Sequence, residues 1–355
     1  MNEKTCKSCN SCFFSEKFPG VVIEENGNCN FCNHGDFKVR KKGQTALDRN
    51  ELYRIAEELK KERKGKYDCI IGASGGLDSS YVIYIARRIL GLNPLVVKYD
   101  HGFNHRIATD NLETICSKLK VDLKIIKSAQ KYDLKYIRFM VLALKDIDLY
   151  WGVCSFCHYI LSTVLYKYAL EENISAILSS YNPYESKLYL KGSFKLKFML
   201  RNVFRLSIIK LVKLVFYMSI AQYYFTRLKL EFYVPPISNV FRSRTKRPGK
   251  IEWVSITRYV EWDIDNMVKT MEEEIGWKKP KESELPMRFD CKIEDSLINY
   301  TYKKATGLTV QGVICNNLIY DRLRTKSELK DTVKRYDDDL IQAMRQMLSD
   351  LKIEK

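Results

Sequence analysis

The stretch Asp68-Cys-Ile-Ile-Gly-Ala-Ser-Gly-Gly-Leu-Asp-Ser-Ser-Tyr-Val82 decides the fold. Its apolar run 69–71 predicts a buried strand, residues 74–80 predict a tight turn, and residues 81–90 predict a helix. Two adjacent glycines allow the turn to bend sharply and to approach a ligand closely. The start of a helix offers free N–H groups and a partial positive charge. The stretch therefore predicts a phosphate or pyrophosphate site between a strand and a helix.

The pattern Ser74-Gly-Gly-Leu-Asp-Ser79 resembles the PP-loop of ATP pyrophosphatases, enzymes that cleave ATP between its α and β phosphates. It is neither a Walker loop, because no Gly-Lys-Ser/Thr follows, nor a Gly-x-Gly-x-x-Gly turn. The resemblance implies that ATP binds here. The candidate phosphate-binding residues are Ser74, Gly75, Gly76, Leu77, Asp78, Ser79 and Ser80. Ser74 and Asp78 are also candidate catalytic residues, and the Asp78 carboxylate is a candidate Mg²⁺ ligand.

Residues 67–181 alternate predicted strands and helices. After the first strand and helix come strands at 94–99, 121–127 and 174–179, and helices at 106–119, 131–144 and 158–170. This order is typical of a doubly wound parallel α/β sheet, whose ligands bind beyond the carboxyl ends of the strands. We expect Asp100 and Asn104 to meet the adenosine part of the ligand and Asn182 and Glu185 to contact substrate. An ordinary turn explains residues 182–185 equally well.

Four cysteines near the start of the chain form two Cys-x-x-Cys pairs. They are Cys6 and Cys9, then Cys29 and Cys32. Two such pairs about twenty residues apart are typical of a zinc site, because each pair supplies two ligands to one tetrahedral ion. Residues 1–42 contain few apolar side chains, so Zn²⁺ would supply much of their folding energy. Cys12 is an additional ligand candidate.

A second group of cysteines consists of Cys154, Cys157 and Cys291. Together they could hold a zinc ion, or three irons of a 4Fe–4S cluster with the fourth iron open. Cys315 or His158 could supply a fourth ligand. The alternative is a pair of structural thiols and an unrelated buried cysteine.

The chain has 355 residues and a net charge of +17 that is unevenly distributed. Residues 187–250 hold 15 Lys and Arg and one acid, so a phosphate-bearing partner or an anionic membrane is to be sought there. No signal peptide is expected at the polar, cysteine-rich start, which favours the cytoplasm. We expect five regions: a zinc module at 1–42, a linker helix at 43–66, an ATP-binding domain at 67–186, a basic amphipathic insertion at 187–250 and a helical region at 251–355.

Residues 196–225 predict an amphipathic helix. Its apolar stripe contains Phe204, Ile208, Leu211, Val215 and Met218, and its cations are Arg201, Arg205, Lys210 and Lys213. The longest uncharged run has 13 residues, below the ~20 needed to span a bilayer, so no transmembrane helix is expected. Two interpretations stay open: a peripheral helix at the inner face of the membrane, or a helix that packs its stripe on the core.

Eight short motifs occur in one order along the chain. They are Cys6-x-x-Cys9, Gly27-Asn-Cys29-Asn-x-Cys32, Ser74-Gly-Gly-Leu-Asp-Ser79, Gly102-Phe-Asn104, Cys154-x-x-Cys157, Asn182-Pro-Tyr-Glu185, Gly276-Trp-Lys-x-Pro280 and Arg288-Phe-Asp-Cys291. Over residues 5–310 this set resembles the N-acetyl sugar amidotransferases of bacterial surface-polysaccharide pathways, including lipopolysaccharide O-antigen biosynthesis. The chain departs from the family at His101, where a small polar residue is expected, and Cys12 is additional.

The resemblance implies an enzyme that converts the acetamido group of a nucleotide-linked sugar to an acetamidino group. ATP would adenylate the acetamido oxygen, and ammonia would then displace AMP. No glutaminase domain is evident, so ammonia would come from a separate glutaminase subunit through a cyclase-like subunit, similar to the pair of histidine biosynthesis.

Two other functions compete with this one. A tRNA thiolation enzyme also combines a PP-loop, a zinc module and three cysteines, and the basic segment could hold tRNA phosphates. The aliphatic character of residues 196–225 and the order of the motifs count against it, so nucleic acid is not the expected partner. The third hypothesis is a nucleotide-binding adaptor without enzymatic activity, which the intact loop disfavours.

Overall fold

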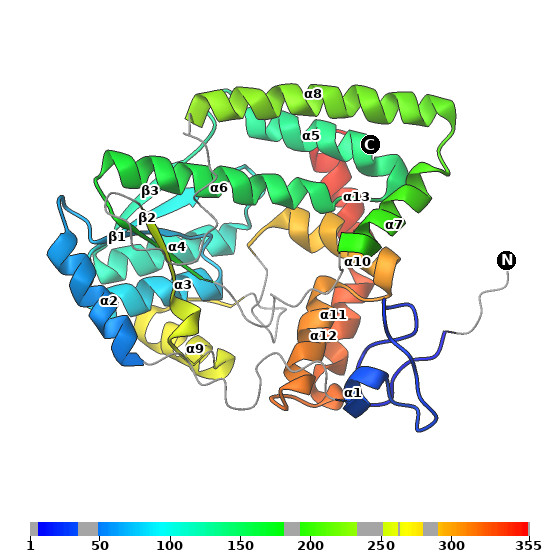
Figure 1. Ribbon diagram of the computed structural model, residues 1–355, viewed down its shortest axis with the longest axis horizontal. Coiled ribbons are helices and arrows are strands. Elements are labelled where there is room, and N and C mark those ends of the chain that lie inside the picture. The colour runs from blue at the N-terminus through cyan, green and yellow to red at the C-terminus, as the bar shows by residue number, and fades with distance from the viewer. Residues whose placement is uncertain are drawn as a thin grey trace.

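The computed structural model describes residues 6–34, 49–180, 192–232, 251–261, 263–279 and 290–353. Five parallel strands form one sheet in the order β3-β2-β1-β4-β5 (Figure 1). The strands are β1 (Cys69–Gly72), β2 (Pro94–Tyr99), β3 (Asp122–Ile126), β4 (Ala176–Ser179) and β5 (Glu252–Ser255). The predicted doubly wound parallel sheet is confirmed, with a glycine-containing turn directly after its first strand.

Helices cover both faces of the sheet. Around it lie α2 (Arg49–Glu62), α3 (Leu77–Tyr84), α4 (Arg106–Leu119), α5 (Tyr132–Leu144), α6 (Trp151–Glu171) and α9 (Ile264–Thr270). Figure 1 shows α6 above the sheet and α3 below it, and both contact β1. All six residues of β2 are buried, as expected for a parallel strand between two helical layers.

The order of the strands locates the ligand site. The chain runs outward from β1 through β2 to β3 and then returns to the other side of β1, where β4 and β5 follow. In such sheets the connections after the two central strands leave in opposite directions and open a crevice at the carboxyl ends. The turn 73–76 follows β1 directly at this crevice.

The sequence predicts helices alone after residue 250, but this region also contributes a strand. Strand β5 pairs in parallel with β4 and completes the sheet. It has only four residues, of which only Val254 is buried, so its alternation is too short to be recognised against the polar sequence before it. The sheet therefore extends beyond residue 186.

The predicted helix at 196–225 is instead two helices, α7 (Gly192–Val203) and α8 (Ile208–Phe232). By length and composition alone α8 is long and apolar enough to cross a membrane. The predicted stripe does not pack on the core, because Phe204 and Ile208 are 82% and 81% exposed. The buried residues of α8 are Ala221, Leu228 and Phe232, near its other end.

The C-terminal region is a helical layer that carries the cysteine module. It comprises α10 (Asn299–Thr306), α11 (Val310–Tyr320), α12 (Lys326–Asp338) and α13 (Leu340–Asp350), and the short α1 (Asn30–His34) lies beside α11 and α12 (Figure 1). Phe13 N donates to Asn316 Oδ1 at 2.8 Å, and Lys326 Nζ donates to the Cys9 carbonyl at 2.7 Å. Helices α12 and α13 pack on the rest of the protein through buried side chains such as Leu329 and Met347.

Candidate functional site

The turn after β1 is held by contacts that only glycine permits. Gly75 has φ of +96°, and a Cβ on it would lie 1.7 Å from the carbonyl oxygen of Ala108 in α4. The Gly75 carbonyl accepts a hydrogen bond from Nε1 of Trp277, 3.2 Å away. Trp277 is almost fully buried. The turn is therefore clamped between α4 and a segment 202 residues further along the chain.

The segment containing Trp277 is itself tied to α4. Gly276 ends the preceding helix with φ of +77°, a left-handed conformation that favours glycine. Asn111 of α4 then makes two hydrogen bonds with the backbone of Lys278, at 2.7 and 2.9 Å. These contacts give the Gly-Trp-Lys motif a structural role in fixing the phosphate turn.

A buried lysine donates a hydrogen bond to the backbone of the turn. Lys98 of β2 is 1% exposed, and its Nζ donates to Thr109 Oγ1 at 2.6 Å and to the Ser74 carbonyl at 3.4 Å. Burial lowers the pKa of Lys98, while the nearby carboxylates of Asp100 and Asp290 act in the opposite direction. An ammonium group at this position would add positive charge beneath the bound phosphates.

A cavity of about 320 Å³ opens above the turn. Of the predicted phosphate-binding residues, Ser74, Gly76, Leu77, Asp78 and Ser79 line it, whereas Gly75 and Ser80 do not. Other lining residues come from distant segments: His158, Ser179, Ser180, Trp253, Asp290 and Glu294. The cavity thus contains three carboxylates.

Sequence reasoning identified Asp78 but missed Asp290 and Glu294 as residues of this site. Asp290 was visible only as part of the Arg-Phe-Asp-Cys motif, and no local signal marked Glu294. Their approach to the turn depends on tertiary contacts, such as the hydrogen bond from His105 N to the Asp290 carbonyl at 3.1 Å. Carboxylates at such a position fit Mg²⁺, a hard cation that prefers oxygen ligands.

A second cavity, of about 130 Å³, adjoins the first and shares Ser74, Asp290 and Glu294 with it. Its walls include all three cysteines of the predicted second group. They are Cys154, Cys157 and Cys291, with Asn104 and His101 beside them. The three thiols do not belong to any group of ligand atoms within 4.8 Å of one another in the described part of the chain. A metal at this position stays a prediction.

His101 lies against Cys291, with its Nε2 3.9 Å from the sulfur. Its Nδ1 accepts a hydrogen bond from Phe103 N at 3.2 Å, so Nε2 carries the proton of the neutral ring. Burial lowers the pKa of His101, which favours this neutral form. The residue that departs from the family pattern therefore faces the cysteine cavity.

The predicted adenosine-contacting residues are held in one compact turn. Asn104 lines the second cavity. The Asp100 carboxylate instead accepts hydrogen bonds from Gly102 N and Asn104 Nδ2 and pairs with Lys127 at 3.1 Å. Hydrogen bonds and this cation hold the pKa of Asp100 below its usual range, against the effect of burial. Asp100 therefore shapes the turn that presents Asn104.

Asn182 and Glu185 lie outside the described residues, and their predicted contact with substrate stays a prediction. The described segment just before them ends in Ser179 and Ser180, and both line the larger cavity.

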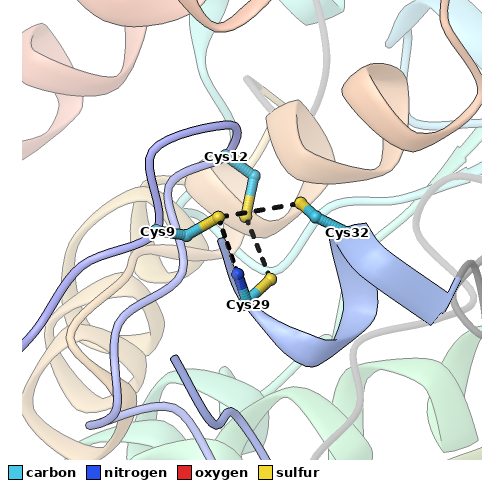
Figure 2. Close-up of side chains that lie close together, drawn as sticks. All are labelled: Cys9, Cys12, Cys29 and Cys32. Carbon is cyan, nitrogen blue, oxygen red and sulfur yellow. Dashed lines mark hydrogen bonds between the residues drawn. The ribbon is translucent and has the colours of Figure 1, made fainter. Parts of the chain in front are cut away.

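Four cysteine side chains converge in the N-terminal module (Figure 2). They are Cys9, Cys12, Cys29 and Cys32, and their sulfurs all lie within 4.8 Å of one another. Two of the Sγ–Sγ distances are 3.7 Å. A tetrahedral zinc ion with Zn–S bonds of about 2.3 Å requires sulfurs about 3.8 Å apart. The cluster therefore fits one zinc ion.

The predicted ligand Cys6 is not part of this cluster, and Cys12 takes its place. Cys6 is exposed, whereas Cys12 is fully buried. The sequence offered both choices, since Cys9 forms a Cys-x-x-Cys pair with either residue. Burial decides between them, because the hydrogen bond from Cys9 N to the Phe14 carbonyl closes a turn that brings Cys12 inward.

Hydrogen-bond donors surround the cysteine cluster. Cys29 N donates to Cys9 Sγ at 3.1 Å, and Phe14 N donates to Cys12 Sγ at 3.4 Å. The hydroxyl of Tyr320, in α11, donates to Cys12 Sγ at 3.1 Å. Such donors favour the thiolate form that zinc binds. The Tyr320 contact also joins the metal module to the C-terminal helices.

Comparisons with known proteins are limited. No protein-family profile matches the chain. A search of curated proteins finds an uncharacterized protein of Methanocaldococcus jannaschii that is 36% identical over 78 residues, which are 22% of this chain and 28% of that protein. The chain thus spans about a quarter of the length of the curated relative it matches.

Three solved structures resemble the chain weakly. The U34-tRNA thiolase NcsA from Methanococcus maripaludis with its 4Fe–4S cluster is 14% identical, with 98% of this chain and 89% of that one covered and a TM-score of 0.36. The ammonia-dependent NAD synthetase of Campylobacter jejuni (16% identity, TM-score 0.30) and the NMN synthetase of Francisella tularensis (14%, 0.27) each cover 54% of this chain and 99% of their own. These similarities are too weak to indicate a function.

The two glycines of the turn should respond differently to substitution. Gly75→Ala should lower the melting temperature, because a left-handed backbone costs a non-glycine residue about 1–2 kcal/mol and its Cβ would clash with Ala108. Gly76→Ala should leave the melting temperature unchanged, since its Cβ meets no atom closer than 3.5 Å. It should weaken ATP binding about tenfold, because the Cβ enters the space that the ligand approaches. Circular dichroism and calorimetric titration with MgATP measure the two effects. An unchanged melting temperature for Gly75→Ala would contradict this account of the turn.

The metal content of two matched cysteine variants tests the cluster. Cys12→Ser should lower bound zinc by about one ion per chain and should lower the melting temperature, because the metal supplies folding energy to the module. Cys6→Ser should change neither quantity. Atomic absorption of the purified proteins provides the measurement. Loss of zinc in Cys6→Ser with full retention in Cys12→Ser would show that the cluster is assigned wrongly.

Proposed function

We propose that the chain is an ATP-dependent N-acetyl sugar amidotransferase of bacterial surface-polysaccharide biosynthesis. Its substrate is a nucleotide-linked sugar whose acetamido group becomes an acetamidino group. ATP is cleaved to AMP and pyrophosphate, and ammonia supplies the new nitrogen.

One observation carries the proposal: motifs from distant parts of the chain line adjoining cavities at the carboxyl ends of the strands. The turn 74–79, the Cys154–Cys157 pair and the Asp290–Cys291 pair all contribute walls. Trp277 fixes the turn itself. These motifs are four of the eight on which the resemblance to the amidotransferases rests. Their proximity in the structure supports a shared function.

The first chemical step activates a poor electrophile. Amide resonance makes the acetamido carbon unreactive, so its oxygen first attacks the α-phosphorus of ATP and the bond to the β-phosphate oxygen breaks. Pyrophosphate leaves, and an imidate ester of AMP forms. The N–H groups at the start of α3 and the Lys98 charge beneath the turn would stabilise the leaving pyrophosphate.

The second step replaces AMP by ammonia. Ammonia adds to the imidate carbon, AMP leaves from the same carbon, and loss of a proton gives the acetamidino group. Asp78, Asp290 and Glu294 line the cavity and would hold Mg²⁺. The bound ion would offset the negative charge on the phosphates. The protein otherwise contributes positioning, and Asn182 and Glu185 are proposed to contact the sugar.

Ammonia is proposed to come from a separate glutaminase subunit through a cyclase-like conduit subunit in the cytoplasm. The basic residues between 187 and 250 would bind the diphosphate of the sugar nucleotide, since this part of the chain holds 15 Lys and Arg and one acid.

A tRNA thiolation enzyme is the second candidate. The observation in its favour is that Cys154, Cys157 and Cys291 line one cavity beside the phosphate turn. Three thiols next to an adenylation site could hold an iron–sulfur cluster with one open iron for a sulfur donor. The two candidates share the ATP chemistry and differ in the group that is adenylated.

AMP release from ATP, measured with ammonium salts, distinguishes the two candidates. We expect UDP-linked acetamido sugars to stimulate release and bulk tRNA to have no effect. The Ser74→Ala variant serves as the loop control and should lower the stimulated rate, because Ser74 lines the cavity. Release that responds to tRNA and not to any acetamido sugar would overturn the amidotransferase proposal and favour thiolation.

A further inference from the structure

Helix α8 has two apolar faces, and only one of them is covered. Its inner face packs along α5, where aromatic rings form a continuous ladder. Tyr224 stacks on Phe139 with ring centroids 5.8 Å apart, and Phe225 contacts Tyr136 at 5.9 Å. Figure 1 shows the two helices side by side at one edge of the molecule. With 25 residues, α8 presents an outer face about 37 Å long.

The end of α8 is anchored in the protein. The carboxylate of Glu231 accepts hydrogen bonds from Ser128 Oγ at 3.0 Å and from Ala129 N at 2.6 Å, just before α5 begins. Leu228 is fully buried in the main core. Since these contacts fix the inner face, α8 lies flat on the molecule and does not cross a bilayer in this arrangement.

The outer face of α8 is apolar and exposed. From Ile208 to Tyr223 most of the exposed side chains are large and apolar. The most exposed of them are Ile208, Ile209, Val212, Val215, Phe216 and Tyr223, each between 57% and 81% exposed. Phe204 continues this surface into the preceding turn, where it is 82% exposed. Large contiguous apolar surfaces of this kind mark interaction sites.

The charges that α7 and α8 contribute around this apolar surface are positive, and of these cations Lys210 pairs with Asp146 at 3.1 Å. Residues 192–232 contain eight Lys and Arg and one acid. That acid is Glu231, whose carboxylate faces inward. The cations Arg201, Arg205 and Lys213 are exposed and lie next to the apolar surface along the chain. An apolar stripe with cations at its flanks is the pattern of helices that lie in the interface of anionic membranes.

We propose that the outer face of α8, together with Phe204, docks the protein flat on an anionic membrane surface. The apolar side chains enter the headgroup region, and the flanking cations contact lipid phosphates. A second copy of the chain is a poorer occupant, because it would bring two surfaces of the same positive charge together. The inference does not depend on which reaction the chain catalyses. It assigns Arg201, Arg205 and Lys213 to lipid phosphates and leaves the remaining basic residues of 187–250 for the sugar nucleotide.

Sedimentation with lipid vesicles tests this proposal on the full chain. We expect binding to phosphatidylcholine vesicles that contain phosphatidylglycerol, weaker binding as salt is raised, and little binding to pure phosphatidylcholine. The Val212→Ser, Phe216→Ser double variant should weaken vesicle binding about tenfold or more, because two large apolar contacts are lost. Its melting temperature should match that of the wild type, since both residues are exposed.

A matched variant controls for general loss of surface hydrophobicity. Leu170→Ser with Ile341→Ser changes two residues on α6 and α13 that are 49% and 55% exposed, and it should bind vesicles like the wild type. The proposal is overturned if the wild type fails to bind anionic vesicles at low salt. It is also overturned if the α8 double variant binds these vesicles as well as the control double variant does. It is also overturned if sedimentation velocity shows a dimer that the α8 variant alone dissociates, without vesicle binding, because the face would then join two copies.

Discussion

The contact between Gly75 and Ala108 is the constraint on which the site depends. A backbone with φ of +96° and no room for a side chain lets the chain leave β1 and enter α3 within four residues. The Trp277 hydrogen bond closes the turn from the other side. Ala108 and Trp277 belong to segments distant in sequence from the turn. The turn can therefore keep this conformation only when α4 and the segment after α9 are in place.

Contacts between distant segments also join the cysteine module to the C-terminal helices. Tyr320 joins the cysteine cluster to α11, and the helical layer that contains α11 also contributes Asp290 and Glu294 through the segment that leads into it. A metal ion held by these cysteines would therefore also stabilise the packing of the C-terminal helices on the module. Coupling of this kind fits a structural role for the cluster, because no residue of the module lines either described cavity.

Local patterns in the sequence predicted strands β1 to β4 and the turn after β1, because apolar runs and glycine spacing are local properties. They predicted neither β5 nor the order of the strands in the sheet, which depends on tertiary structure. They could not predict which cysteine completes the cluster, since Cys6 and Cys12 stand at equal spacing from Cys9 and differ only in burial. Glu294 carries no local signal and joins the site through tertiary structure. Helix α8 carries aromatic side chains outside its predicted apolar stripe, and these side chains pack on α5. The stripe by itself therefore did not show which face of the helix is covered.

The central claim is that ATP bound at the turn 74–80 is cleaved between its α and β phosphates. Phosphorus NMR of a reaction with MgATP, ammonium and an acetamido sugar nucleotide tests it most directly, because each product has its own resonance. The account predicts AMP and pyrophosphate in equal amounts, with neither formed by the Gly75→Ala variant. Formation of ADP and orthophosphate would contradict it, since the bond broken would then be the one between the β and γ phosphates.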